Sequence, residues 1–157
     1  MRNPKWLMPL ILTTLLAAVL LPIISASYAN IKKGEDEFAA QNYRGASDSF
    51  ERAASFLPWR DDLWEQAGIA SGLSGNPSNA ITFLNRAPKL SEQGWLVLGT
   101  SYFNTGDISS ALEAYQQGSQ IYDSASLYAG LAYIYRQQKN WAAESDALKN
   151  QTRLGTE

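Results

Sequence analysis

A four-residue pattern of small and large, mostly apolar side chains repeats along this chain at nearly regular intervals. Each clear copy holds a small residue, an alanine, a large apolar residue and another small residue, always at the same separations. Three copies are clear and the fourth is weak: Gly34, Ala46, Phe50, Ala53; Gly68, Ala80, Leu84, Ala87; Gly99, Ala111, Tyr115, Gly118; and Ala132, Glu144, Leu148, Gln151. A nearly constant step between copies with a constant inner spacing is typical of stacked helical hairpins. We therefore expect an all-α chain of about four helix-turn-helix repeats.

The copy over residues 61–91 shows how one repeat is built. Apolar positions at helical spacing predict a first helix that starts at Asp61, which we expect to act as its N-cap. Gly75 predicts the break between the two helices. Asn76 is a good N-cap for the second helix, and Pro77 fits its first turn.

Two copies depart from the pattern. The second is about three residues short, and Pro88 lies earlier than a closing proline would, so we expect a tight turn at residues 88–91. We expect its second helix to carry Ala87. The fourth has Glu144 where a small residue is expected. We expect its last helix to expose polar residues, Glu144 among them, to water, as terminal repeats do. The alternative is that a partner covers this end.

The residues at these places resemble the tetratricopeptide repeat. The third copy carries the resemblance most clearly, through Trp95, Leu98, Gly99, Tyr102, Ala111 and Tyr115. The resemblance implies a right-handed solenoid over residues 29–157, with repeats at about 27–60, 61–91, 92–124 and 125–157. These signature residues are packing residues, so they predict the fold rather than the partner.

Residues 1–28 have a different composition and predict a membrane anchor. From residue 6 to residue 26 the chain is uncharged and rich in Leu, Ile, Val and Ala. About 20 such residues cross a bilayer as a helix. Arg2 and Lys5 precede the segment and favour a cytoplasmic N-terminus. We expect a single-pass anchor in the cell membrane, with residues 6–26 in the lipid bilayer and the repeats on the extracytoplasmic side.

A cleaved signal peptide is the alternative, because Ser27, Tyr28 and Ala29 form a small-x-small site. The apolar core is longer than is typical of signal peptides, which favours the uncleaved anchor. No proline or other strong helix breaker lies between Ile23 and Lys33. We therefore expect the apolar helix to run directly into the first repeat helix.

Composition narrows the chemistry. Histidine and cysteine are absent, which removes the commonest general base, thiolate chemistry, disulfides and the usual transition-metal ligands. Basic and acidic residues are scattered, so no nucleic-acid surface is predicted. Glu35, Asp36 and Glu37 are consecutive, and on a helix they point to different faces rather than toward one metal ion. We expect no catalytic site, cofactor or metal; an enzyme that uses Asp, Glu, Lys and Tyr alone is the least favoured alternative.

The resemblance implies a concave face lined by the first helix of each repeat. The residues placed there are Glu65, Gln66, Ile69, Leu73, Leu96, Val97, Thr100, Phe103, Asn104, Tyr133, Arg136 and Gln137. Some family members grip a C-terminal carboxylate with Lys, Asn and Arg on this face. Here the equivalent places hold Ile31, Glu35, Gln66, Gln93 and Val97, so we do not expect that clamp. A mixed apolar and polar groove suits an extended or helical protein segment.

Together these features predict a bacterial, membrane-anchored protein of the tetratricopeptide type that binds other proteins. It would serve as a scaffold, an assembly factor or an accessory subunit of a membrane complex. The alternative within the same class is a secreted or periplasmic soluble adaptor, released by cleavage of the signal peptide.

Overall fold

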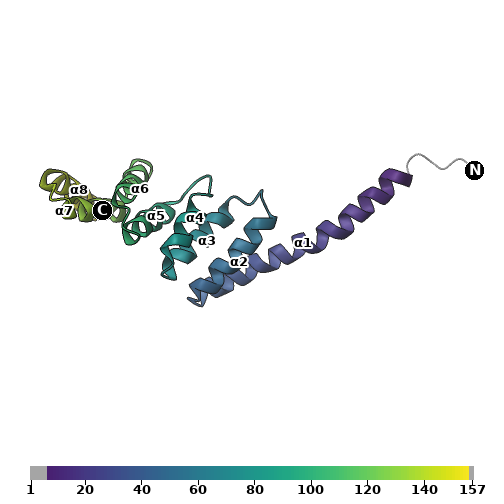
Figure 1. Ribbon diagram of the computed structural model, residues 1–157. Helices are drawn as coiled ribbons and strands as arrows, with labels where there is room; N and C mark the ends of the chain where they lie inside the picture. Colours follow the sequence, from purple (N-terminus) through teal and green to yellow (C-terminus); the bar gives the residue numbers. More distant parts are fainter. Residues whose placement is uncertain (1–6, 156–157) are drawn as a thin grey trace, which may run out of the picture.

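The computed structural model describes residues 7–155 of the chain. Within this range the chain forms helices and no strand: α1 (Leu7–Ala39), α2 (Tyr43–Phe56), α3 (Asp62–Leu73), α4 (Pro77–Leu84), α5 (Glu92–Asn104), α6 (Ile108–Ile121), α7 (Ala125–Gln137) and α8 (Trp141–Gly155). Successive helices pair into hairpins that stack side by side, and α1 projects beyond them as a long rod (Figure 1). The predicted all-α solenoid is confirmed. Residues 1–6 of the predicted anchor lie outside the described residues.

The tight turns inside the hairpins share one backbone conformation. Each contains a residue with positive φ at the same place in the repeat: Gln41 (60°), Gly75 (80°), Gly106 (84°) and Lys139 (57°). The following residue donates its backbone N–H to a carbonyl in the last turn of the first helix, and its side chain accepts a backbone N–H in the first turn of the second. These N-cap residues are Asn42, Asn76, Asp107 and Asn140. One short motif therefore ends the first helix and caps the second in every hairpin.

The recurring glycines make room for the large apolar residue of the same copy. A Cβ atom on Gly34 would lie 2.8 Å from the ring of Phe50, and one on Gly68 would lie 2.5 Å from Cγ of Leu84. Contacts this short are not possible for real Cβ atoms, so each glycine is required for the two helices of a hairpin to approach closely.

Two local predictions about the second repeat are wrong. Asp61 occupies the N-cap position of α3, but its side chain makes no capping hydrogen bond. The neighbouring Asp62 carboxylate pairs with Arg60 Nη2 at 2.8 Å. The helix expected to include Ala87 ends at Leu84. Pro88 supplies the reason, because a proline lacks the N–H that a continuing helix needs and restricts the residue before it. The connection over residues 85–91 contains a turn at residues 85–86 and a bend at residues 88–89, so it is longer than a tight turn.

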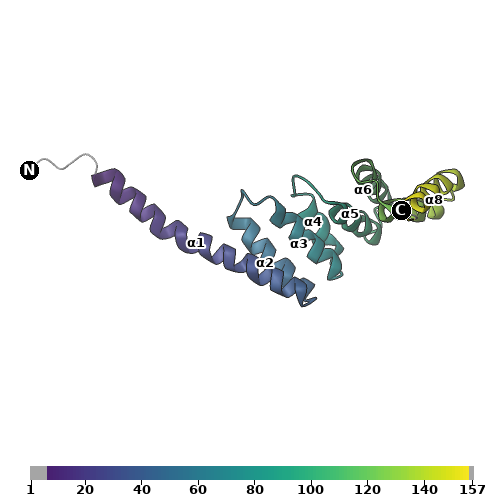
Figure 2. The ribbon, with the colours of Figure 1, turned by 180° about the vertical axis from the view of Figure 1, so that it is seen from behind.

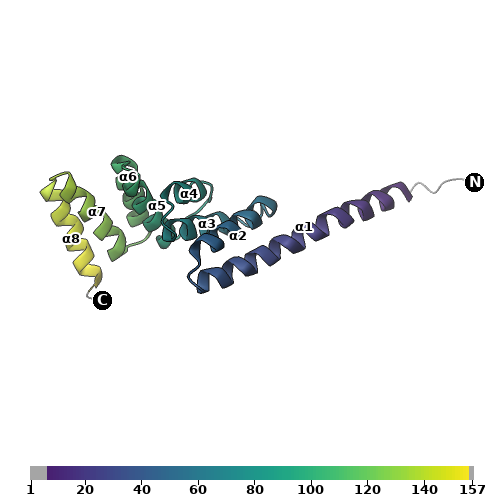
Figure 3. The same cartoon turned by 60° about the horizontal axis from the view of Figure 1, so that its bottom comes forward.

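The hairpins enclose a chain of small cores rather than one central core. The first core contains Ile31, Phe50, Leu57 and Leu63, and Ile24 packs against its edge. Views from behind and from below show α1 lying along α2 over half of its length and then leaving the hairpins (Figures 2 and 3). The predicted continuity of the apolar helix with the first repeat helix is confirmed, and Pro22 lies inside α1 without ending it.

Candidate partner-binding groove and apolar helix

The first helices of the repeats form a row. Along this row α3 packs on α5 and α5 packs on α7, whereas α1 packs mainly on α2. Because α1 and α3 are not closely packed, the row opens between them. Two hollows lie along it, and we call them the proximal hollow, next to α1, and the distal hollow, next to α5.

The proximal hollow has a volume of about 330 Å³ and is lined by residues of α1, α2, α3 and α5. Its lining residues are Glu35, Phe38, Ala39, Phe50, Gln66, Ile69 and Gln93. The structure thus brings the predicted groove residues Gln66 and Ile69 together. It also brings in Phe38 and Ala39 of α1, which the sequence analysis did not assign to the groove. Phe38 follows Gly34 at the same interval as Phe103 follows Gly99, and this shared offset could have identified it.

The distal hollow has a volume of about 380 Å³ and lies between the end of α3 and the middle of α5. Its lining residues are Gly72, Leu73, Gly75, Pro77, Leu96, Val97, Thr100, Ser101 and Asn104. Five of the predicted groove residues meet here: Leu73, Leu96, Val97, Thr100 and Asn104. The Thr100 hydroxyl is already engaged, since it donates to the Leu96 carbonyl at 2.8 Å and lies 2.9 Å from the Tyr115 hydroxyl. Burial raises the pKa of Tyr115, so this phenol stays protonated and available as a donor.

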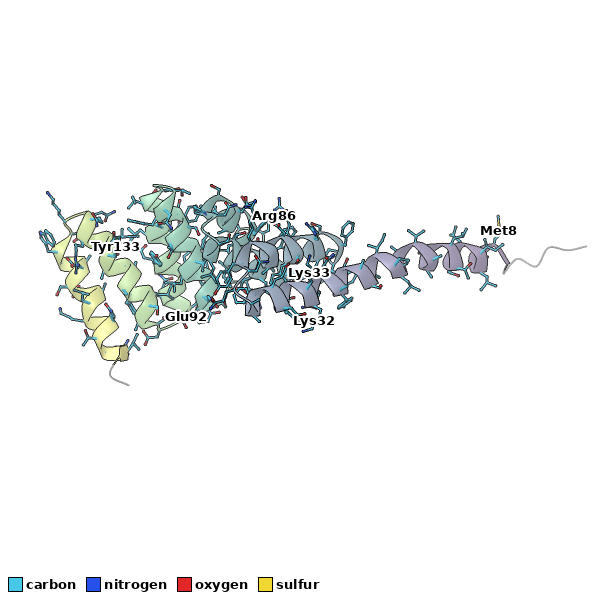
Figure 4. All side chains as sticks on the ribbon, turned by 90° about the horizontal axis from the view of Figure 1, so that it is seen from below. Met8, Lys32, Lys33, Arg86, Glu92 and Tyr133 are labelled. Carbon is cyan, nitrogen blue, oxygen red and sulfur yellow. The ribbon has the colours of Figure 1, made fainter. Side chains whose placement is uncertain are left out.

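The predicted groove residues of α7 lie farther along the row. Tyr133, labelled in Figure 4, is half exposed. Its ring meets Phe103 edge to face, with the ring centroids 5.2 Å apart. Arg136 donates from Nε to Glu144 Oε1 at 2.6 Å, and Gln137 is exposed. Glu144 itself is only 8% exposed. The large residue at this small-residue position is therefore held inside the hairpin by a salt bridge, and the expectation that Glu144 faces water is wrong.

Glu65 lies apart from the other predicted groove residues. Its carboxylate accepts the backbone N–H of Ser91 at 2.5 Å, and Ser91 is the N-cap of α5. It lines a separate hollow with Asp61, Asp62, Pro88 and Lys89, at the connection between α4 and α5. Glu65 thus stabilises the connection between α4 and α5.

Charge is sparse along both hollows. Glu35 is the charged residue of the proximal hollow, and the distal lining is uncharged. Neither lining contains a Lys or Arg, so neither offers the cationic partner that a peptide carboxylate would need. Over residues 7–155 no group of three or more Asp, Glu, His or Cys side chains is placed to hold a metal ion.

The free half of α1 exposes apolar side chains on all sides. Met8, Leu12, Leu15 and Val19 are each at least 61% exposed. Figure 4 places Met8 at the far end of this rod, while Lys32 and Lys33 lie where α1 runs beside the hairpins. Within the described part of the chain, α1 is the helix that is long and apolar enough to cross a membrane.

Comparison with solved structures identifies the architecture. The MamA protein superposes with a TM-score of 0.75 at 16% identity, covering 83% of this chain and 74% of that one. A chain of the APC/C hetero-tetramer Cut9-Hcn1 gives 0.69 at 16% identity, covering 90% of this chain and 29% of that one. The Sgt2 TPR domain from Aspergillus fumigatus superposes with a TM-score of 0.60 at 24% identity, covering 74% of this chain and 81% of that one. No family model and no curated protein matches the sequence. The resemblance carried by the signature residues is confirmed for the fold: this chain folds as a tetratricopeptide-repeat-like solenoid.

Proposed function

We propose that this chain is a membrane-anchored adaptor that binds a segment of another protein along the row of first helices. It acts as a scaffold, an assembly factor or an accessory subunit of a membrane complex. The observation that carries the proposal is that a single helix, α1, supplies both the exposed apolar rod and one wall of the proximal hollow. A partner bound there is held close to the bilayer.

The packing around Ser27 supports retention of the apolar segment. Ser27 is only 2% exposed, its hydroxyl donates to the Ile23 carbonyl at 2.8 Å, and Ile24 packs against the first core. Cleavage after Ala29 would remove all three residues from the first hairpin. A secreted adaptor would therefore have to fold without part of its own core, so the uncleaved anchor is the better interpretation.

The hollows favour an uncharged or basic segment with apolar side chains. Phe38 and Ile69 provide an apolar surface in the proximal hollow, while Gln66 and Gln93 offer amide groups for a peptide backbone. Glu35 repels a carboxylate and attracts a Lys or Arg of the ligand. We propose an extended chain as the ligand, because it can place alternate side chains in the two hollows.

The basic residues before the apolar segment place the N-terminus in the cytoplasm in this proposal. The repeats then lie on the extracytoplasmic side of the cell membrane. Two measurements test the anchor. The intact mass of the native protein shows whether the segment is retained, and washing membranes with carbonate shows whether the full-length form stays with the lipid. A mature chain that starts near Asn30 would support the secreted adaptor instead.

The partner is tested by mild detergent extraction from native membranes, followed by mass spectrometry of the proteins that co-purify. Leu73→Asp places a charge in the distal hollow, where Leu73 is 44% exposed. Ile121→Asp is the matched control, because Ile121 is 63% exposed on α6 and lines neither hollow. We expect the first variant to lose the partner and the control to retain it. A partner kept equally by both variants contradicts the groove.

A further inference from the structure

Two large aromatic side chains are exposed at the end of α2 and in its connection to α3, outside the cores of the repeats. Phe56 is 57% exposed and Trp59 is 58% exposed. They are not on a loose loop, because Leu57 between them is fully buried and its N–H bonds the Ala53 carbonyl at 3.0 Å. The Arg60 N–H in turn bonds the Leu57 carbonyl at 2.9 Å. Both rings are therefore held outward by an ordered turn.

The direction of α2 determines where this turn lies along α1. Ser49 near the middle of α2 donates to Glu37 Oε2 at 2.9 Å, and Phe50 packs on Gly34. The two helices are therefore antiparallel, and at Phe56 α2 has reached the level of Tyr28. The C-terminal end of α2 thus points toward the apolar rod, and Figure 1 shows the α2–α3 connection beside the place where α1 leaves the hairpins.

The same level is the end of the apolar segment. The last strongly apolar residues of the rod are Ile23 and Ile24, and Tyr28, which is 47% exposed, follows about one turn later. Tyr and Trp side chains at such a boundary favour the headgroup region of a bilayer, where the ring is partly buried and its polar group meets water. Tyr28, Phe56 and Trp59 therefore lie at the depth where a spanning α1 would leave the lipid.

The charges around the turn suit aromatic rather than electrostatic contact. Arg60 is paired with Asp62, and Asp61 beside them is exposed. Arg52 is also exposed, one turn before Phe56, so the charges near the turn are of both signs and the proposed attraction comes from the rings. A zwitterionic surface such as phosphatidylcholine is sufficient for this kind of binding.

We infer that the α2–α3 connection is a second membrane contact, in which Phe56 and Trp59 dip into the interfacial layer beside the exit point of α1. This inference rests on the proposed membrane span. Lipid is favoured over a protein partner as the occupant because the turn is packed onto the helix that enters the bilayer and lies at the end of its apolar segment. The contact would fix the tilt of the solenoid above the membrane.

The absence of cysteine makes the test direct, because single labelling sites can be introduced into the full chain. Ser55→Cys, Leu15→Cys and Trp141→Cys each receive a nitroxide label, and the protein is reconstituted into phosphatidylcholine nanodiscs. Depth is measured from the relative accessibility of each label to oxygen and to a water-soluble nickel complex. Position 15 reports the span, position 55 the turn with both rings intact, and position 141 the far end of the solenoid.

We expect hydrocarbon depth at position 15, interfacial depth at position 55 and full water exposure at position 141. Adding Phe56→Ser and Trp59→Ser should raise the nickel accessibility at position 55 several-fold without changing it at position 141. Water exposure at position 55, or no change on removing the rings, overturns the inference while the span at position 15 stands. Water exposure at position 15 removes the span itself and with it the proposed function.

Discussion

The ring of Tyr115 lies directly against Gly99, so closely that a Cβ atom on the glycine would come within 2.6 Å of Tyr115 Cε1. A Cβ atom on Gly130 of α7 would lie 2.7 Å from the same ring atom. One aromatic ring therefore occupies space left by two glycines on neighbouring hairpins. This contact joins the inside of the third repeat to the start of the fourth.

We expect Gly99→Ala to lower the free energy of unfolding by about 1–3 kcal/mol, because the added methyl overpacks the contact with Tyr115. Urea unfolding followed by circular dichroism, on the full chain in detergent micelles, measures the change. Gly155→Ala is the control, since nothing lies within 4 Å of its added Cβ. The packing argument is contradicted if the two variants are equally stable.

Lys139 holds a left-handed backbone conformation, with φ of 57°, at the place where Gly75 and Gly106 stand in the middle repeats. A side chain in this region costs about 1 kcal/mol relative to glycine. Lys139→Gly should therefore raise the melting temperature of the protein. Gln138→Gly, at a neighbouring residue with φ of −81°, should not raise it and reveals any general effect of adding glycine. A lower melting temperature for Lys139→Gly would contradict the strain.

The salt bridge between Arg136 and Glu144 should respond unequally to the loss of its two members. Arg136→Ala leaves a buried carboxylate without its partner, and we expect a cost of about 1–2 kcal/mol, moderated because the guanidinium is 58% exposed. Glu144→Ala removes the buried charge itself and restores the small residue of the repeat pattern, so its cost should be smaller. Chemical denaturation of both variants gives the comparison.

Lys149→Ala serves as the reference for that pair of variants. Lys149 bonds Asp146 at 3.0 Å, but both side chains are more than 70% exposed, so its loss should change stability by less than about 0.5 kcal/mol. If Glu144→Ala lowers stability more than Arg136→Ala does, the argument that an unpaired buried carboxylate is the larger cost is contradicted.

Asp107 should make the stability of α6 depend on acid. Hydrogen bonds from the side chain and backbone of Ser110, and from Ser109, lower the pKa of Asp107 from its usual value of 3.8. A lowered pKa in the folded state means that the contribution is present at neutral pH and is lost as the pH falls below 3.8 and through the folded-state pKa. Asp107→Asn retains a capping acceptor but no titrating group.

Amide exchange of α6, measured from neutral pH to below 3.8, tests this dependence. Exchange rates are compared with Asp107→Asn at each pH, so that the intrinsic effect of pH on exchange cancels. The native chain should lose its advantage over the variant in the acid range. A difference that does not change with pH would show that the carboxylate charge has no part in capping.

A chain that begins at Asn30 should fold its first hairpin poorly. It lacks Ile24, which packs against the first core, and the buried Ser27, both near the C-terminal end of α2. Hydrogen exchange should be faster in α2 than in the same helix of the full chain, while α5 to α8 remain protected because each hairpin contacts only its neighbours. Equal protection of α2 in both chains would remove the structural argument against signal cleavage.

The hairpins could be predicted from the sequence because their defining contacts are local. Gly34 meets Phe50 and Gly68 meets Leu84 at a fixed separation, so a spacing in the sequence is also a contact in space. The N-cap at Asn76 was equally predictable, since the residue it caps is three positions away.

The features that escaped prediction depend on contacts between distant residues. Glu65 is a predicted groove residue, but its carboxylate accepts the backbone N–H of Ser91. Ser91 lies in the connection between α4 and α5, whose course the repeat pattern does not specify. Phe38 was missed because its role depends on α1 standing away from α3. Five predicted residues do gather at the distal hollow, but the pattern could not divide the groove into two parts. Binding by these residues stays a prediction.

Because α1 is one unbroken helix, its length fixes the orientation of the groove relative to the apolar rod, which a flexible tether would not do. Each residue of an α-helix turns it by about 100° and advances it by about 1.5 Å. One extra residue between Leu20 and Ile23 would leave the packing of Ile24 and Ser27 in the first hairpin intact. It would nevertheless rotate the wall formed by Glu35 and Phe38 by about 100° about the helix axis, relative to the apolar part of α1 that precedes it. The number of residues in this short stretch therefore sets the direction that the groove faces relative to the exposed apolar rod.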